Sequence, residues 1–396
     1  MGLAENSLMH RELEGQMKEN FHIDLSSHYT YGQGPNGSPQ LTLALSRFMN
    51  KTLQPLDPIS AEQLVITSGV ASAIDSLTWC LCDEGEGILS PQPLYAGFIG
   101  DIELRSHGKL LPVSYRHDHG AYNALDLFDA EATRVAFERA IRKYSDQGIK
   151  TRAVLISNPH NPLGRCYSEA TLVEIARFCS RHQLHLISDE IYANSIFKNQ
   201  AFPEAQEFKS VLSVDLAGII DQRQFHVLYG MSKDFGANGM RLGALHTRDS
   251  SLNDAVTTIN QFAWPAYLTQ DIWTRVLSDD VFIGQYISLN QRRMSDRYHQ
   301  LTTLLRQHGI PYLEGGNAGF FVWAHLIRQD PEEAPKLKEE LLRQCQQVGL
   351  FIRDGGKYLG EEPEDGWFRI TFTLDAGTLD VGWERLAQCL QAMKLL

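Results

Sequence analysis

The stretch AVLISNPHNPLGRCYSEATLVEIARFCSRHQLHLISDE, residues 153–190, decides the fold of this chain. It begins with an apolar run that ends in polar residues and proline, and it closes with a second run of the same kind, as buried strands do. Between the two runs, residues 169–182 carry apolar side chains on one face at helical spacing. A strand, a helix and a second strand form a βαβ unit, which predicts a mainly parallel sheet.

Further apolar runs extend this sheet along the chain. We expect strands at residues 63–67, 87–91 and 225–229, because each run is short and ends in polar or glycine residues. In a sheet of this kind the ligand lies beyond the carboxyl ends of the strands, where the helices begin. The polar residues at those ends are therefore the candidates for a functional site.

From about residue 278 the pattern changes. A long charged helix is followed by a glycine-rich aromatic segment at 315–323, another helix and a strand at 367–372. This order predicts a second, smaller α+β domain. The acidic stretch 354–366 within it carries glycines and predicts a surface loop.

The composition is that of a globular protein that binds small molecules. The 396 residues are 43% hydrophobic and 21% charged, which is enough to bury a large core divided between two subdomains. The net charge is -12, and Lys and Arg are spread along the chain, so no basic face indicates nucleic acid or an anionic membrane as a partner. We expect small molecules and a second copy of this chain as partners.

Metal, disulfide and membrane chemistry are not indicated. The six cysteines are scattered, and Cys80 and Cys82 have the wrong spacing for a zinc or redox motif, so we expect reduced thiols and no metal site. No apolar run reaches the roughly 20 residues of a membrane span. The first ten residues lack the basic and apolar regions of a signal peptide, so a cytoplasmic location is expected.

Lys233 lies in the segment SKDFGANGMRLG, residues 232–243, directly after an apolar strand and before a glycine-rich turn. An isolated lysine at a strand end is usually a surface residue with a buried stem and a solvated amine. Partial burial and neighbouring charge, however, lower the pKa of such an amine and suit it to form a Schiff base. The neighbouring motifs decide between these two interpretations.

Asp189, Tyr192 and Asn161 follow predicted strands of the same sheet. A carboxylate at the end of a buried strand requires a partner, and Asp189 would keep a pyridine nitrogen protonated. The prolines on either side of Asn161 fix a turn that would hold its amide toward a phenolic oxygen, to which Tyr192 would also donate. With a lysine, these are the groups that pyridoxal 5'-phosphate requires.

Such a site also needs a phosphate cradle, a stacking ring and a carboxylate anchor. Small residues at 68–73 would let the N-terminus of a helix approach a phosphate, and Arg241 lies eight residues after Lys233. Tyr95 follows a strand where it would stack on the ring, and Arg369 carries a fork that matches a carboxylate. Each motif alone is also typical of a tight turn or a structural salt bridge, but together they predict a pyridoxal phosphate site.

With these motifs the chain resembles, over essentially its whole length, the class I/II aminotransferases and within them the branch of the 1-aminocyclopropane-1-carboxylate synthases. The matching motifs are GLAEN (2–6), NPHNPLG (158–164), SDEIY (188–192), SKD (232–234) with Gly239 and Arg241, NAGFFVW (317–323) and GWFR (366–369). The resemblance implies an α/β chain with the aminotransferase-like fold of pyridoxal phosphate-dependent transferases. In this fold a large domain carries a mainly parallel seven-stranded sheet and a smaller domain is α+β.

The resemblance also implies the roles of single residues. Lys233 would hold the cofactor as a Schiff base and act in catalysis, while Glu5 and Arg369 would bind an amino-acid substrate. The implied cofactor ligands are the backbone N–H groups of Val70 and Ala71 and the side chains of Tyr95, Asn161, Asp189, Tyr192 and Arg241.

A homodimer with shared active sites is implied as well. Residues 1–40 would form an N-terminal segment of the small domain and the dimer interface, residues 41–280 the large cofactor-binding domain, and residues 281–396 the small domain. The family's chains begin well before the GLAEN motif, so we expect an N-terminal arm to be lacking here or to have been removed.

Two positions depart from the family's pattern. Gly230 stands where a hydroxyl residue normally binds the phosphate, so we expect Ser232 or Ser68 to supply that donor. Pro35 stands where the synthases have a tyrosine that assists ring closure, and Tyr31 is the residue expected to reach the cofactor instead.

The reaction itself stays open between three outcomes. Loss of the α-proton to Lys233 leads to transamination, to cyclopropane formation with expulsion of a γ-sulfonium group as in S-adenosylmethionine, or to C–S cleavage by β-elimination of a thiolate. A further alternative is a pyridoxal phosphate-binding homologue that has lost turnover. The sequence thus predicts a transferase or lyase acting at the α-carbon of an amino acid, either one with a sulfur leaving group or, for transamination, a hydrophobic one.

Overall fold

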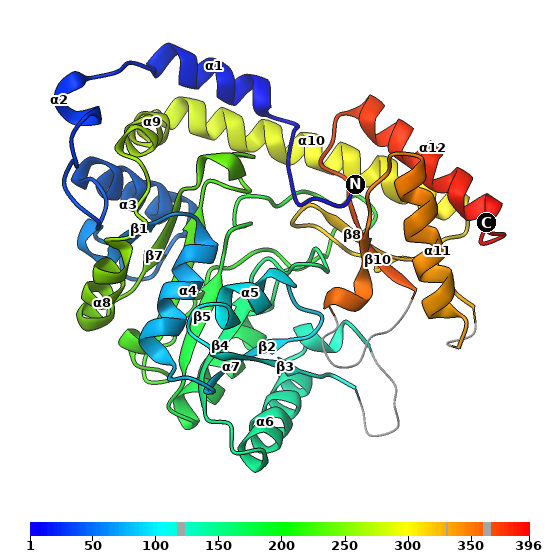
Figure 1. Ribbon diagram of the computed structural model, residues 1–396, viewed down its shortest axis with the longest axis horizontal. Coiled ribbons are helices and arrows are strands. Elements are labelled where there is room, and N and C mark those ends of the chain that lie inside the picture. Colours follow the sequence, from blue (N-terminus) through cyan, green and yellow to red (C-terminus); the bar gives the residue numbers. More distant parts are fainter. Residues whose placement is uncertain (117–122, 330–331, 359–365) are drawn as a thin grey trace.

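The computed structural model describes residues 1–116, 123–329, 332–358 and 366–396. Its largest layer is a seven-stranded sheet in the order β1-β7-β6-β5-β4-β2-β3 (Figure 1). The strands are β1 (Leu64–Thr67), β2 (Gly87–Pro91), β3 (Lys109–Val113), β4 (Thr151–Ser157), β5 (His185–Asp189), β6 (Phe225–Gly230) and β7 (Gly243–His246). Strand β7 is antiparallel to β1 and β6, and the other neighbours are parallel. The predicted mainly parallel seven-stranded sheet is therefore confirmed.

The βαβ unit that decides the fold is formed by β4, α7 (Glu169–Arg181) and β5. Strands β4 and β5 are neighbours near the middle of the sheet, and nearly all of their residues are buried. Parallel strands that are covered on both faces have continuous apolar sequences, which explains the two apolar runs. Helix α7 begins after Ser168, whose side chain accepts a hydrogen bond from the backbone N–H of Thr171.

Helices cover both faces of this sheet, because alternate residues of a strand point to opposite sides. In β4, Leu155 packs with residues of α4, α5 and α8, whereas Val154 and Ile156 pack with residues of α3, α6, α7 and α9. The bounds of these helices are α3 (Pro39–Leu53), α4 (Val70–Leu81), α5 (Gly97–Glu103), α6 (Ala130–Asp146), α8 (Ser250–Asn260) and α9 (Tyr267–Ser278).

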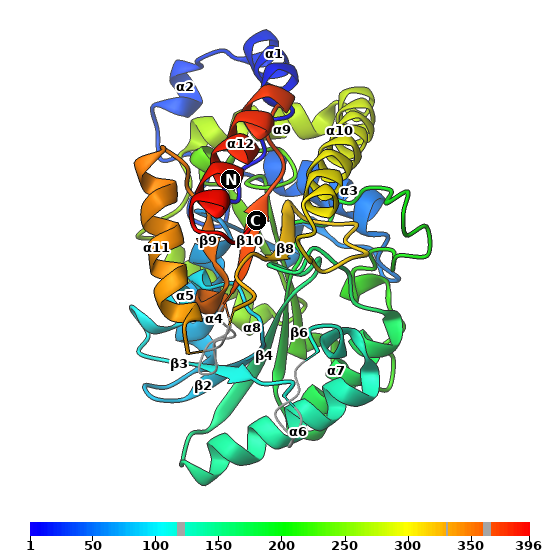
Figure 2. The same ribbon diagram turned by 90° about the vertical axis from the view of Figure 1, so that its right-hand side faces the viewer.

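A second, antiparallel sheet in the order β8-β10-β9 lies in the C-terminal part of the chain (Figure 2). Its strands are β8 (Phe321–His325), β9 (Arg353–Asp354) and β10 (Trp367–Thr371), and its helices are α10 (Asp280–Gln307), α11 (Ala334–Gln347) and α12 (Ala376–Ala392). The expected smaller α+β part is thus present. The domain limits at residues 40 and 280 stay predictions.

The N-terminal segment joins both parts. Its first residues run along the small sheet, where Thr371 donates its backbone N–H to the Met1 carbonyl at 2.8 Å and Ser7 donates to Thr373 at 3.1 Å. It then forms α1 (His10–Asn20) and α2 (Leu25–His28), both of which pack against α9 (Figure 1). Across the described ranges, we find no helix long and apolar enough to span a membrane.

The prediction of a surface loop at 354–366 is wrong at its start. Asp354 pairs with Phe368 of β10, and residues Gly355–Tyr358 form a 3-10 turn. The Tyr358 side chain is buried against Trp323, although the acidic composition of the stretch is typical of a surface loop. Residues 359–365 of this stretch lie outside the described residues.

Gly230, the position where a hydroxyl residue is expected, ends β6 directly opposite Gly243 of β7. A Cβ atom on Gly230 would lie 2.8 Å from the Leu242 carbonyl oxygen and 3.2 Å from Cδ1 of Ile191. Both distances are shorter than ordinary van der Waals contact, and the first neighbour is backbone. The strand pairing therefore leaves no room for a side chain at this position.

We expect Gly230→Ser to lower the free energy of unfolding by about 1–3 kcal/mol, because overpacking forces the backbone to move. Urea unfolding followed by circular dichroism measures this change. Gly284→Ala in α10 is the matched control, since its Cβ would meet nothing within 4 Å and removal of a helical glycine adds about 0.5–1 kcal/mol. Equal stability of Gly230→Ser and the unchanged protein would contradict the steric argument.

Candidate active site

Two connected cavities open where the carboxyl ends of β4, β5 and β6 face the small sheet. The inner cavity has a volume of about 250 Å³ and the outer cavity one of about 380 Å³, and both are lined by Tyr95, Lys233 and Asn238. The inner cavity contains the predicted residues Val70, Ala71, Tyr95, Asn161, Asp189, Tyr192, Ser232, Lys233 and Arg241. The outer cavity contains Glu5 and Arg369. Residues far apart in the sequence thus meet at one edge of the sheet.

Lys233 is half-buried in the turn that follows β6. Its Nζ donates a hydrogen bond to the Ala4 carbonyl oxygen at 2.7 Å. Burial lowers the pKa of this amine to about 8, and the positive charge of Arg369 acts in the same direction. The neutral, nucleophilic form of this amine is therefore much more populated near neutral pH than that of an ordinary lysine.

Asp189 ends β5 and is 6% exposed. Its Oδ1 accepts one hydrogen bond, from the backbone N–H of Ile191 at 3.2 Å. Burial raises the pKa of this carboxyl to about 7, and the nearby charge of Asp101 also raises it. A cationic N–H group that enters the cavity would stabilise the ionised form of this carboxyl group.

Arg369 is a buried cation without an ion-pair partner in the described part of the chain. Its Nη1 donates to Oδ1 of Asn161 at 3.0 Å, and its Nη2 donates to the Gly2 carbonyl at 2.9 Å. The guanidinium lies over the Phe321 ring at 4.1 Å, and its Nε has no hydrogen-bond partner. Burial lowers the pKa of this group, so an anion bound here would be strongly stabilised.

Asn161 and Tyr192 present donors to the inner cavity. Because Oδ1 of Asn161 accepts from Arg369, the Asn161 amide nitrogen is left to donate to a ligand. The Tyr192 hydroxyl is buried without a hydrogen-bond partner, and its ring meets Phe320 edge-on at 5.1 Å. Burial raises the pKa of Tyr192, so that its hydroxyl keeps its proton. A buried hydroxyl without a partner is costly unless a ligand satisfies it.

An anion cradle lies at the start of α4. The helix has no side-chain cap, and Gly69 before it has a φ of 87°. The first N–H groups, at Val70 and Ala71, therefore have no intrahelical partners, and both residues line the inner cavity. Arg241, at a φ of 52°, donates to the Asn238 and Ser68 carbonyls at 2.8 and 3.2 Å. A side chain on Gly69 would collide with this guanidinium. Only glycine therefore allows Arg241 to lie beside the helix start.

Of the two serines expected to replace the donor missing at Gly230, the structure favours Ser232. It lines the inner cavity, whereas the Ser68 hydroxyl donates to the Ala263 carbonyl. Glu190, the residue after Asp189, accepts from the backbone N–H of Val211 at 2.9 Å and from the Ser188 hydroxyl at 3.0 Å.

Tyr31 is not brought into either cavity of this chain. It is 88% exposed in the segment between α2 and α3, and Pro35 of the same segment also lies outside both cavities. Glu5 does line the outer cavity, where its Oε1 accepts from Nδ2 of Asn238 at 2.9 Å.

Sequence reasoning missed several cavity residues, among them Asn238, Asp101, Arg353 and Tyr358. Asn238 and Asp101 follow predicted site residues in the chain, and their polar side chains near Lys233 and Tyr95 were the available signal. Arg353 and Tyr358 line the outer cavity from a two-residue strand and a 3-10 turn. Elements this short have no periodicity from which to predict them.

These groups fit pyridoxal 5'-phosphate. The uncapped helix start and Arg241 suit a dianionic phosphate, the unpaired Asp189 suits a protonated pyridine nitrogen, and the free donors of Asn161 and Tyr192 suit a phenolate oxygen. The Lys233 amine, with its lowered pKa, suits an aldehyde.

Comparison with known proteins agrees with this assignment. The pattern of the family described as "Aminotransferase class I and II" matches residues 1–386. The chain is 33% identical to 1-aminocyclopropane-1-carboxylate synthase 1 of Oryza sativa subsp. indica and 31% identical to 1-aminocyclopropane-1-carboxylate synthase 8 of Arabidopsis thaliana. Both similarities cover 98% of this chain, and they cover 79% and 81% of the two relatives.

Solved structures share the fold at lower identity. The aromatic aminotransferase from Pyrococcus horikoshii OT3 superposes with a TM-score of 0.77 at 20% identity over 100% of this chain and 96% of that one. Aspartate aminotransferase from Thermus thermophilus with maleate gives a TM-score of 0.77 at 18% identity over 98% and 90% of the two chains.

We expect Arg241→Met to weaken the affinity for pyridoxal 5'-phosphate about 10- to 100-fold, since a hydrogen bond to a charged group contributes about 1.5–3 kcal/mol. The affinity for pyridoxal, which lacks the phosphate, should not change. Fluorescence titration of the apoprotein measures both constants. Arg223→Met, which removes an exposed arginine paired with Asp221, is the control. An equal loss for both ligands would show that Arg241 does not act on the phosphate.

Proposed function

Since the chain belongs to the class I and II aminotransferase family, which depends on pyridoxal 5'-phosphate, we propose that it transaminates an amino acid with Lys233 as the proton carrier. The observation that carries this proposal is the cavity in which the Lys233 amine, with a pKa of about 8, lies near the buried and unpaired guanidinium of Arg369. Arg369 anchors the substrate carboxylate, and Lys233 moves the proton of the α-carbon next to it.

Substrate binding begins at Arg369. Its planar guanidinium accepts a carboxylate in a two-pronged geometry, and the hydrogen bond to Asn161 fixes its orientation. The rings of Phe321 and Tyr358, at 4.1 and 5.1 Å, exclude water from this cation. The α-carbon of an amino acid held here is thereby directed toward Lys233, which lines the same cavity.

Proton transfer falls to Lys233. Bound pyridoxal phosphate supplies an electron-withdrawing ring that stabilises negative charge at the α-carbon. The neutral Lys233 amine then accepts the α-proton, and the resulting ammonium can return it to a neighbouring carbon. Burial raises the pKa values of Tyr95 and Tyr192, so both hydroxyls stay protonated and do not compete as bases. Asp189 would keep the pyridine nitrogen protonated.

Cyclopropane formation is the second candidate. It is favoured by the synthases that are 33% and 31% identical to this chain and by Glu5, which lines the outer cavity. Against it, Pro35 replaces the tyrosine that assists ring closure in the synthases, and Tyr31, which was expected to take its place, lies outside both cavities of this chain. C–S cleavage of a sulfur-bearing amino acid requires the same first step.

We propose further that two copies of this chain share their active sites through the N-terminal segment, since members of this family typically form dimers. Phe21, Ile23, Leu25, Tyr29 and Tyr31 are all exposed in this segment. Clustered exposed apolar side chains mark association surfaces. In such a dimer, Tyr31 would reach the site of the partner.

Lys233→Ala is expected to slow exchange of the substrate's α-proton with D2O by about 100- to 10,000-fold, the usual contribution of a general base. In the unchanged protein the rate should rise with pH up to about 8 and then level off, because only the neutral amine accepts a proton. Proton NMR measures the exchange. Lys51→Ala, a surface lysine paired with Asp280, is the control.

Product analysis separates the reactions. A new amino acid formed from a 2-oxo acid supports transamination, methylthioadenosine released from S-adenosylmethionine supports ring closure, and a thiol with pyruvate supports C–S cleavage. A cofactor-loaded protein that exchanges no α-proton with any amino acid would refute the proposal and indicate a binding protein.

For the dimer, replacing Leu25 and Tyr29 with Asp is expected to convert dimers into monomers in sedimentation velocity, because two buried charges would oppose association. Val381→Asp on α12, which is also exposed, is the control and should leave the mass unchanged. A dimer that survives the double substitution would place the interface elsewhere.

A further inference from the structure

The outer cavity holds a second arginine beside Arg369. Strands β9 and β10 pair so that Arg353 lies directly opposite Arg369, and both residues line this cavity. Residues directly opposite each other in an antiparallel pair have Cα atoms about 4.5–5.5 Å apart and side chains on the same face. Two like charges in this position repel each other unless an anion lies between or beside them.

The described part of the chain supplies no such anion. The carboxylate of Asp354 lies near Lys338 at 3.6 Å and accepts the backbone N–H of Gly356. The Glu5 carboxylate accepts from Asn238. Neither these nor any other described carboxylate forms an ion pair with Arg353 or Arg369.

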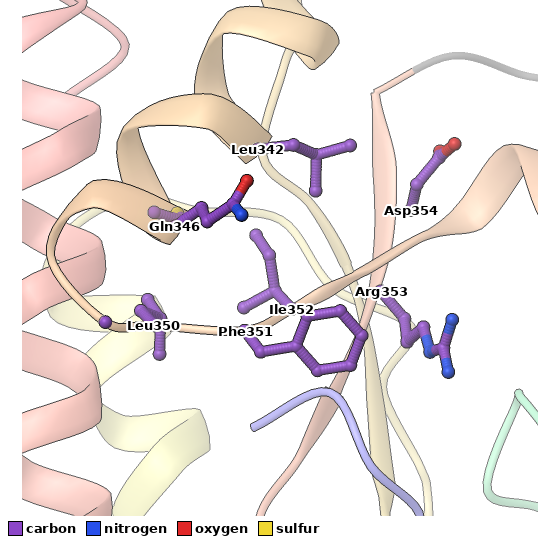
Figure 3. Close-up of a pocket in the computed structure, with 9 residues that line it drawn as sticks. Leu342, Gln346, Leu350, Phe351, Ile352, Arg353 and Asp354 are labelled. Atoms are coloured by element: carbon purple, nitrogen blue, oxygen red, sulfur yellow. The ribbon is translucent and has the colours of Figure 1, made fainter.

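Stacking holds Arg353 in place while leaving its N–H groups available. The Arg353 guanidinium lies 4.9 Å from the centre of the Phe351 ring, and both side chains project from the same side of their segment, away from Leu342 (Figure 3). Such a ring interacts with the face of the guanidinium, whereas the N–H donors lie along its edge and stay available for a hydrogen-bond acceptor. Arg353 also lines a hollow of about 460 Å³ between α11 and β9, so it belongs to the wall of two cavities.

The charge of Arg353 acts inside the outer cavity. Burial raises the pKa values of Tyr95 and Tyr358, and the positive charge of Arg353 opposes both shifts. Burial lowers the pKa of Arg369, and Arg353 adds to that shift. Three cavity side chains therefore experience this one guanidinium.

We propose that Arg353 binds a second negatively charged group of the substrate, so that the enzyme acts on amino acids with a short anionic side chain while Arg369 holds the α-carboxylate. This assignment rests on the proposed function and specifies its substrate class. It also predicts discrimination against S-adenosylmethionine, because a sulfonium cation placed between two guanidinium groups would be repelled.

The test compares charged ligands with uncharged ligands of nearly the same shape. The dissociation constants of L-aspartate and L-glutamate are measured against those of L-asparagine and L-glutamine, from the change in cofactor absorption of the holoenzyme. We expect the acidic amino acids to bind about tenfold more tightly or better, as a charge-assisted pair provides. Arg353→Gln should abolish this preference and leave the constants of the two amides unchanged.

Two further variants make the result specific to Arg353. Arg353→Lys should keep part of the preference, because it keeps the charge but not the fork. Arg343→Gln on α11, an exposed arginine paired with Glu340, removes the same charge outside the cavity and should change neither constant. Thermal unfolding of each variant shows whether it remains folded.

A ligand that cannot react separates this inference from the proposed function. Calorimetry with succinate and with its monoamide measures anion binding without any chemistry, and succinate should bind more weakly to Arg353→Gln than to the unchanged holoenzyme. Equal binding of aspartate and asparagine, or a preference that survives in Arg353→Gln, would overturn the assignment. Loss of α-proton exchange alone would overturn only the proposed reaction.

Discussion

The hydrogen bonds of the Arg369 guanidinium hold the candidate site together. One donor reaches Asn161 in the turn after β4, another reaches the Gly2 carbonyl of the N-terminal segment, and the plane rests on Phe321 of the small sheet. Three segments remote in sequence therefore depend on one cation. Because burial of a charge is costly unless polar groups surround it, displacement of any of these segments would raise the free energy of the others.

The electrostatics of the cavities follow from burial more than from charge pairing. Burial lowers the pKa of the Lys233 amine to about 8 and raises that of the Asp189 carboxyl to about 7. The pKa of a basic group is thus lowered toward pH 7 and that of an acidic group is raised toward it, which is typical of sites that transfer protons near neutral pH. Asp101, in the same cavity, shares this pattern, with a pKa raised to about 6 by burial.

Much of this arrangement was predictable from the sequence, because buried parallel strands have continuous apolar runs and their carboxyl ends meet at one edge. Lys233, Asp189 and Asn161 each follow such a run, and the structure brings them together. Arg353 and Tyr358 were not predictable, because β9 has two residues and an acidic neighbouring stretch resembles a loop. The exposed position of Tyr31 was not predictable either, because the segment between α2 and α3 has no periodic pattern that indicates which of its side chains are buried.

The glycine pair between β6 and β7 has a consequence for the end of the cavity at which α4 begins. Gly243 packs so closely on Gly69 and Val70 that a Cβ there would lie 2.7 Å from the Val70 nitrogen, and Gly230 faces it with no more space. A hydroxyl residue at 230 would thus require the neighbouring strand to shift, which would in turn disturb the start of α4. The backbone spacing between β6 and β7 thus limits which residue can stand at 230, and with it which residue can supply a phosphate donor at this end of the cavity.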